Sequence, residues 1–227
     1  MRYDTLLFDA DGTLLDFKLA EREAFIGAMS CHGVSVDDSI IATYSQINDR
    51  LWKMLERKET TRAELRVRRF AELADTCGFE YDATTVADTY AEELAQQSQL
   101  LGNALEVCTR LCRDCRLYLI TNGFKKIQEG RFKHSPLYPL FSGVFISEDI
   151  GCDKPALQYF DVVRASIPDF CVQRSLVIGD SLTSDIRGGI NAGIDVCWFN
   201  PMHKIAPDDM NINYMIDNLA ELYDIIK

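Results

Sequence analysis

Short blocks of consecutive apolar residues alternate along most of the chain with stretches in which apolar residues recur every three or four positions. Uninterrupted apolar blocks of four to six residues are typical of strands buried on both faces of a parallel sheet. The three-to-four spacing is typical of helices with one buried face. We predict strands at 5–9, 116–120, 143–146, 175–178 and 195–199, and helices at 104–112, 125–132, 156–165, 182–192 and 218–226. This alternation predicts an α/β protein with a Rossmann-like, doubly wound parallel sheet.

Residues 17–97 have a different pattern, because helical spacing recurs there with no apolar block between the repeats. We predict four helices in this stretch, at 21–29, 40–55, 62–74 and 83–94. The stretch begins soon after the first strand and ends before the next helix of the α/β pattern. The sequence therefore predicts a core formed by residues 1–16 and 98–227, with residues 17–97 inserted as an α-helical cap domain.

Small polar loops follow the predicted strands. Because ligands of doubly wound sheets bind at the carboxyl ends of the strands, these loops are the candidate site. Two acids, Asp9 and Asp11, end the first apolar block, and two negative charges there need a cation to offset their repulsion. The other loops hold Thr121 and Asn122, then Lys154, then Asp180 and Asp185.

Composition limits the partners of the protein. The 227 residues carry a formal net charge of −11, which disfavours binding to nucleic acid polymers and anionic membranes. No apolar stretch is long enough to span a bilayer and no signal-peptide pattern begins the chain, so we expect a cytoplasmic protein. Eight scattered cysteines in a chain of this size favour reduced thiols.

In order and content, four segments resemble the signature motifs of the haloacid dehalogenase (HAD) superfamily of aspartate-nucleophile phosphohydrolases. They are Asp9-Ala10-Asp11-Gly12-Thr13, Thr121-Asn122-Gly123, Asp153-Lys154-Pro155 and Gly179 to Asp185. The helical insertion resembles the cap of one large subgroup. The resemblance implies a Mg²⁺-dependent phosphomonoester hydrolase that forms an aspartyl-phosphate.

Each motif residue then has an expected role. Asp9 would attack phosphorus and Asp11 would serve as general acid and then as base. By resemblance, Asp9, the backbone carbonyl of Asp11, and Asp180 hold the metal. Asp185 would support a metal-bound water or the lysine, although an acid at a helix N-terminus needs no such role.

The remaining motif residues are expected to bind phosphate. The Thr121 hydroxyl and the Asn122 N–H would be phosphate ligands, although a Thr before Asn-Gly is also a common turn residue. Lys154 would bind the phosphate and neutralise the crowded carboxylates.

Further segments resemble the YjjG-type pyrimidine 5′-nucleotidases. They are 121–124, 146–151, 188–193 and 197–200. In the insertion, Asn48 and Trp52 lie four residues apart with Arg69 downstream, a pattern that is also similar to that group. The resemblance favours a nucleoside 5′-monophosphate as substrate, with these three residues as substrate ligands. Trp52 could equally belong to the core and Arg69 to the surface.

Other functions remain open. A sugar-phosphate or phosphoglycolate phosphatase is the main alternative, followed by a phosphomutase and a non-catalytic phosphate sensor. A dehalogenase needs neither a second acid nor a metal, so Asp11 disfavours it. The partner would be a small phosphorylated metabolite, and the protein a monomer or homodimer. Cys108, Cys112 and Cys115 match the spacing of an iron–sulfur motif, but the same spacing predicts one buried face of the helix that precedes the strand.

Overall fold

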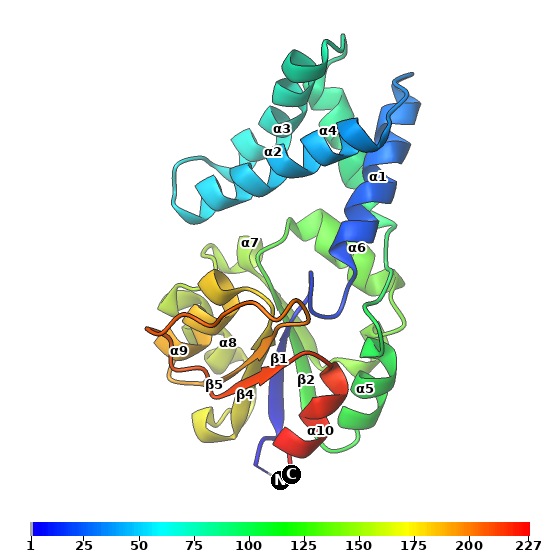
Figure 1. The fold of residues 1–227 in the computed structure, drawn as a ribbon. Coiled ribbons are helices and arrows are strands. Elements are labelled where there is room, and N and C mark those ends of the chain that lie inside the picture. The colour runs from blue at the N-terminus through cyan, green and yellow to red at the C-terminus, as the bar shows by residue number, and fades with distance from the viewer. Residues whose placement is uncertain (1) are drawn as a thin grey trace. The chain divides into compact units, whose positions relative to one another are not determined.

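The computed structural model describes residues 2–227, and its central feature is a six-stranded sheet in which every neighbouring pair is parallel. The strand order is β3-β2-β1-β4-β5-β6, with β1 at the centre (Figure 1). This confirms the predicted Rossmann-like doubly wound sheet. The strands are β1 (Thr5–Asp9), β2 (Arg116–Thr121), β3 (Gly143–Ile146), β4 (Ser175–Gly179), β5 (Asp195–Phe199) and β6 (Tyr214–Ile216).

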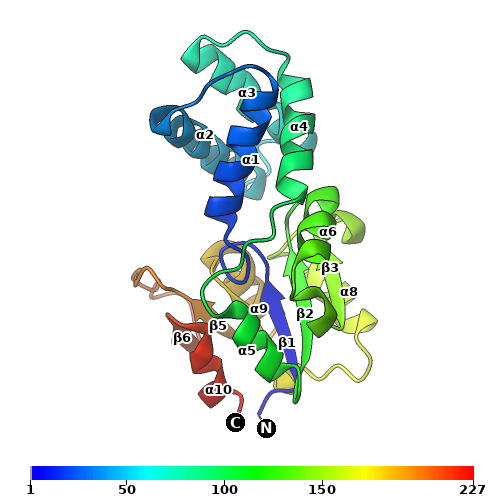
Figure 2. The same ribbon diagram turned by 90° about the vertical axis from the view of Figure 1, so that its right-hand side faces the viewer.

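Helices cover both faces of the sheet. Alternate residues of β1 point to opposite faces, so Leu6 and Phe8 enter one apolar core and Leu7 enters the other. The first core contains residues of α5 (Ala104–Leu111), α6 (Lys125–His134) and α10 (Leu222–Ile225); the second contains residues of α8 (Leu157–Ser166). Figure 2 shows α5 and α10 on the same side of the sheet. Burial on both faces explains why the strands are uninterrupted apolar blocks.

The insertion consists of α1 (Phe17–Cys31), α2 (Asp38–Glu56), α3 (Arg62–Cys77) and α4 (Ala83–Ala95). Side chains at the N-termini of α2, α3 and α4 accept hydrogen bonds from the first turn, as N-caps do. Asp37 caps α2, Asp82 caps α4, and Thr61 forms a capping box with Glu64 at the start of α3. These caps fix where the helices begin.

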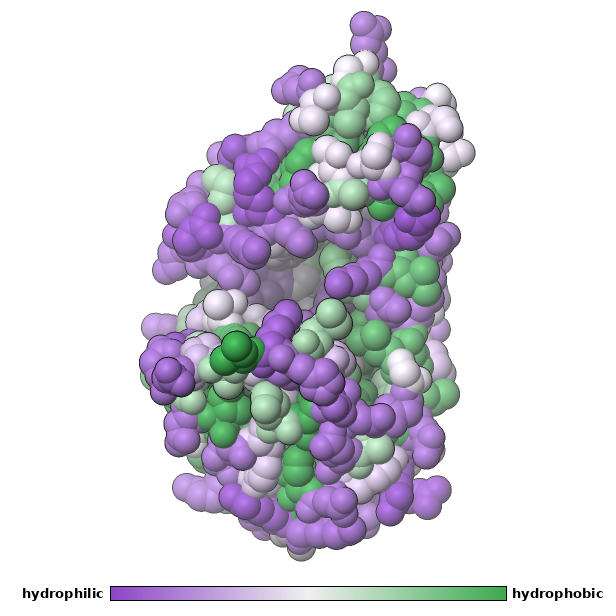
Figure 3. All heavy atoms as spheres, viewed as in Figure 1, coloured by the Kyte–Doolittle hydropathy of each residue, from purple (hydrophilic) through white to green (hydrophobic). Residues whose placement is uncertain are grey.

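The insertion has an aromatic core of its own. The rings of Phe25 and Tyr44 stack with centroids 4.2 Å apart, and Phe70 and Tyr90 pack against Tyr44. Hydrophilic side chains dominate its visible surface over α2 (Figure 3). Contacts between residues divide the chain into two compact units, one formed by residues 1–17 with 98–227 and the other by residues 18–97.

Several predicted helices differ from the observed elements. The helix predicted at 182–192 is a π-helical turn over Leu182–Ile186 followed by α9 (Arg187–Asn191), and a 3₁₀ turn over Leu219–Glu221 precedes α10. The helix α5 ends at Leu111, so Cys115 lies beyond it and points its thiol at the carbonyl of Tyr3. None of the helices in residues 2–227 has the length and apolar character needed to cross a membrane.

Two short elements were not predicted from the sequence. The helix α7 (Ser147–Ile150) follows β3, and the edge strand β6 has three residues, of which Met215 is exposed. Neither is long enough to give a hydrophobic period that could be recognised in the sequence.

Candidate active site

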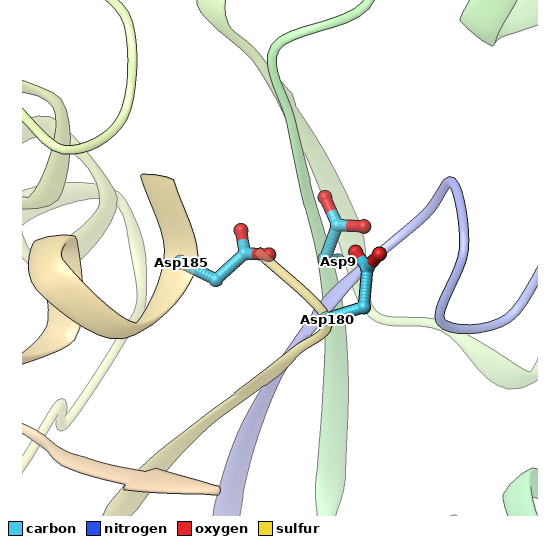
Figure 4. Close-up of side chains that lie close together, drawn as sticks. All are labelled: Asp9, Asp180 and Asp185. Atoms are coloured by element: carbon cyan, nitrogen blue, oxygen red, sulfur yellow. The ribbon is translucent and has the colours of Figure 1, made fainter. Parts of the chain in front are cut away.

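Three aspartates meet at the carboxyl edge of the sheet. Asp9 ends β1 and Asp180 follows β4, and these two strands are hydrogen-bonded neighbours, so their ends coincide. Asp185 reaches the same point from the π-helical turn. One carboxylate oxygen from each of the three lies within 4.8 Å of the others (Figure 4). Asp9 and Asp185 are buried, and Asp180 is partly exposed.

Two glycines leave room for this cluster. Gly12 has a φ of +85°, and a Cβ atom there would lie 2.7 Å from Oδ2 of Asp180. A Cβ atom on Gly179 would collide with the Asp185 carboxylate. Both acids therefore pack directly against backbone, which only glycine permits at these positions.

A buried lysine bridges two of the acids. The Nζ atom of Lys154 lies 2.7 Å from Oδ1 of Asp9 and 2.6 Å from Oδ1 of Asp185, and it also donates to the Ile120 carbonyl. Burial alone would lower the pKa of Lys154, but the charges of Asp185 and Asp9 raise it above its usual value. The lysine therefore remains a cation that holds the two carboxylates in place.

One lysine does not balance three buried or half-buried carboxylates. Burial, and then the charge of Asp185, raise the pKa of Asp180 to about 7. The same two causes raise the pKa of Asp9, and Lys154 only partly opposes them. The excess negative charge and the all-oxygen donor set suit a hard divalent cation such as Mg²⁺.

Neighbouring groups fix the orientation of these residues. The side-chain amide of Asn122 pairs with the backbone of Lys154 through two hydrogen bonds, of 2.8 and 2.9 Å. The Thr121 hydroxyl is buried and accepts a hydrogen bond from the Gly123 N–H. The indole of Trp198 donates to the backbone carbonyl of Asp180. The roles of the Asn122 side chain and of Trp198 were not predicted from the sequence.

The side chain of Asp11 faces α6. Its carboxylate accepts hydrogen bonds from Gln128 and Arg131, which lie three residues apart on one helix face. Neither of these two residues was predicted from the sequence to belong to the site. One feature of the sequence could have indicated them. Both are polar residues on the otherwise apolar inner face of the helix that follows Thr121-Asn122-Gly123.

In the helical unit the structure brings two of the three predicted substrate ligands together. Asn48 and Arg69 are both buried, and Nη1 of Arg69 donates to the Asn48 amide oxygen over 3.1 Å. Asn48 also donates to Glu21, whose pKa is raised, mainly by burial. Trp52 is half-buried and pairs instead with the guanidinium of Arg62, 5.9 Å from the ring centre.

The sequence also matches a known family of hydrolases. The family model described as haloacid dehalogenase-like hydrolase matches residues 3–193. The chain belongs to this family, which confirms the expected resemblance and identifies the protein as an enzyme of the HAD type.

Individual proteins of known sequence or structure are similar to the chain over its full length. The chain is 40% identical to the pyrimidine 5′-nucleotidase PynA of Streptococcus pneumoniae, over all of this chain and 96% of the relative. It is 29% identical to the pyrimidine 5′-nucleotidase YjjG of Escherichia coli, over 100% and 99% of the two chains. The crystal structure of the HAD-hydrolase YfnB of Bacillus subtilis, described as bound to magnesium, superposes with a TM-score of 0.95 at 38% identity and covers all of both chains.

Proposed function

We propose that the protein is a Mg²⁺-dependent phosphomonoester hydrolase in which Asp9 is the nucleophile. The observation that carries the proposal is the position of the Asp9 carboxylate. It accepts a hydrogen bond from Lys154 and lies beside Asp180 and Asp185. A buried carboxylate among other acids is stable only with counter-charges, and a phosphate dianion is excluded from such a site without them. Asp9, the backbone carbonyl of Asp11, Asp180 and Asp185 would hold the ion.

The chemistry divides into two displacements. In the first, a carboxylate oxygen of Asp9 forms a bond to phosphorus, the bond to the leaving oxygen breaks, and Asp11 supplies the proton that this oxygen takes up. In the second, Asp11 accepts a proton from water as the water oxygen bonds to phosphorus, and the Asp9–phosphate bond breaks. Bound magnesium would stabilise the negative charge on the phosphoryl oxygens. The Thr121 hydroxyl, the Asn122 N–H and Lys154 would bind the phosphate.

We further propose that the substrates are pyrimidine nucleoside 5′-monophosphates. Support comes from PynA and YjjG, two nucleotidases similar to this chain over its full length. In the helical unit, the buried Arg69 guanidinium is a group of the type that recognises a base edge. Asn48, whose amide already bonds Glu21 and Arg69, would act by orienting that guanidinium. Two nitrogens of the buried Arg69 guanidinium, Nε and Nη2, have no hydrogen-bond partner among the described residues. Trp52 is the candidate for stacking against a ring.

Phosphate release from a panel of substrates tests this function. Purified protein with Mg²⁺ should release phosphate from uridine and thymidine 5′-monophosphates with a higher kcat/KM than from sugar phosphates or phosphoglycolate. A preference for the latter group would contradict the substrate assignment, and transfer of phosphate to a second site of the product would indicate a mutase. No release from any ester, aryl phosphates included, would indicate a sensor.

The mechanism has its own test. Asp9→Asn should abolish turnover, with a loss of at least about 10⁴-fold, because the amide cannot act as the nucleophile. The fold should persist, since Asn keeps the shape of the side chain, and circular dichroism would check this. Full activity of the variant would contradict the aspartyl-phosphate mechanism.

A further inference from the structure

Two side chains of α6 hold the Asp11 carboxylate from one side. Gln128 donates from Nε2 to Oδ2 and Arg131 donates from Nη1 to Oδ1. Since each donor takes a different oxygen, the pair fixes both the direction and the plane of the carboxylate. A single hydrogen bond would leave the group free to rotate about its last torsion.

The contact joins a buried cation to a partly exposed acid. The side chain of Arg131 is fully buried and that of Asp11 is 25% exposed, so the cation comes from the interior and the acid faces outward. The Arg131 guanidinium also lies 5.7 Å from the centre of the Phe17 ring, which limits its movement. A buried guanidinium is costly to desolvate unless it is paired, so Arg131 is committed to this position.

The position of Gln128 leaves one of its polar atoms without a hydrogen bond from the described residues. Its carbonyl oxygen Oε1 is buried and has no hydrogen-bond partner among the described residues. A buried unpaired oxygen destabilises the fold, and an apolar residue of similar shape would avoid the loss. The side chain also lies so close to Gly123 that a Cβ atom there would collide with it. Fold stability therefore does not account for a glutamine at this position.

We propose that Gln128 and Arg131 are positioning residues, which hold Asp11 in the orientation for proton transfer to the leaving oxygen. The inference rests on the proposed function, in which Asp11 is the general acid. Proton transfer needs the donor oxygen within about 2.6–3.2 Å of its target, so a freely rotating carboxyl group would be in place only part of the time. The helix that follows the phosphate loop at Thr121 and Asn122 thus also orients the acid.

The dependence on the leaving group tests the inference. An alkoxide leaving group, as in a nucleoside 5′-monophosphate, needs the proton, whereas 2,4-dinitrophenolate leaves without it. The value of kcat/KM reports the steps up to departure of the leaving group. For Arg131→Met and Gln128→Met we expect kcat/KM for the nucleotide to fall by about 10- to 100-fold, part of the usual contribution of a general acid. For 2,4-dinitrophenyl phosphate we expect little change.

Control variants separate positioning from general damage. Lys133→Met alters an exposed cation of the same helix and should leave both activities unchanged. Arg131→Lys, which keeps one donor, should recover part of the nucleotide activity. Gln128→Met removes the unpaired oxygen and should fold at least as stably as the wild type, which keeps the test valid even if Arg131→Met unfolds.

Three outcomes would count against the inference. Equal losses on both substrates would overturn it, because a structural defect affects every leaving group alike. Faster nucleotide hydrolysis in the variants would also overturn it, since the contact would then restrain Asp11. If the wild type hydrolyses neither ester, the proposed function itself is wrong, and the role of Gln128 and Arg131 falls with it.

Discussion

At the scale of single residues, the site has more negative than positive charge, because one lysine lies among three carboxylates. Lys154 forms ion pairs with Asp9 and Asp185. Asp180 lies beside them, and no cation among the described residues forms a hydrogen bond or ion pair with it. Its pKa rises to about 7 mainly because the carboxylate is buried, and then because Asp185 repels its charge. Protonation and metal binding are therefore alternative ways to stabilise the same group.

The raised pKa of Asp180 predicts how stability depends on pH when metal is absent. The folded-state pKa is about 7 and the unfolded value is about 3.9, so between these values the folded state binds more protons. Stability should therefore fall as pH rises through 5–7. Thermal unfolding in EDTA should show a Tm several degrees lower at pH 8 than at pH 5.5.

Asp180→Asn provides the comparison for this prediction. The variant lacks the titrating group, so its Tm should vary less over the same pH range and should exceed that of the wild type at pH 8. Excess Mg²⁺ should raise the wild-type Tm more at pH 8 than at pH 5.5, because the metal competes with the proton. An identical slope in both proteins would contradict the assignment of the effect to Asp180.

At the scale of elements, the turn after β1 carries much of the site. It is held by backbone hydrogen bonds from Leu14 and Leu15 to the Ala10 carbonyl and from Gly12 to the Leu15 carbonyl. The positive φ of Gly12 lets the chain reverse direction while Asp180 packs against its Cα. The turn thereby sets the distance between the acids of β1 and β4.

Gly12→Ala tests the importance of this close approach. The added methyl group would meet Asp180, and a left-handed alanine costs about 1–2 kcal/mol of stability. We expect the affinity for Mg²⁺ to fall by at least about tenfold, since a shift of one ligand disrupts the donor set. Isothermal titration with MgCl₂ would measure the change.

Gly33→Ala is the matched control for backbone strain. Gly33 also has a positive φ, of +72°, but a Cβ atom there would have no neighbour within 4 Å. This variant should lose comparable stability and keep its affinity for Mg²⁺. If both variants lose affinity equally, the effect is general destabilisation and not the contact with Asp180.

The elements also show what the sequence could predict. Asp9, Lys154 and Asp180 could be placed together because each lies at or after the carboxyl end of a strand of a parallel sheet. These ends converge whatever the side-chain details. The contact of Gln128 and Arg131 with Asp11 could not be predicted from the sequence. Helical spacing shows which residues share a face of a helix, but it does not show what that face contacts. The Cys115 error has the same origin, since spacing continues past Leu111 although the helix ends there.

At the scale of the whole molecule, the sheet unit and the inserted helices each have their own buried residues. The sheet and its flanking helices bury separate clusters on each face and present the acidic site. The inserted helices bury an aromatic group around Tyr44 together with the polar set of Glu21, Asn48 and Arg69. Burial of Asn48 was not predicted, because an asparagine on a helix is usually exposed. Tertiary contacts with Glu21 and Arg69 satisfy its amide.

Because each unit has its own core, we expect local unfolding of the insertion without loss of the sheet. Phe25→Ala removes a buried ring that stacks on Tyr44, a change that typically costs about 3–5 kcal/mol. Hydrogen exchange followed by mass spectrometry should show reduced protection in residues 18–97 and unchanged protection in β1, β2 and β4. Hydrolysis of a small aryl phosphate should be less affected than hydrolysis of a nucleotide, if the insertion selects the substrate.

Phe160→Ala provides the reciprocal change, since Phe160 is buried in the second cluster beside the sheet. Protection should then fall in the strands and persist in the inserted helices, and both activities should decline together because Asp9 and Asp180 extend from those strands. If either variant reduced protection uniformly along the chain, the two units would form one cooperative structure. Substrate selection and chemistry would then not be separable by mutation, because any loss of packing in the insertion would also disturb the carboxylates at the sheet edge.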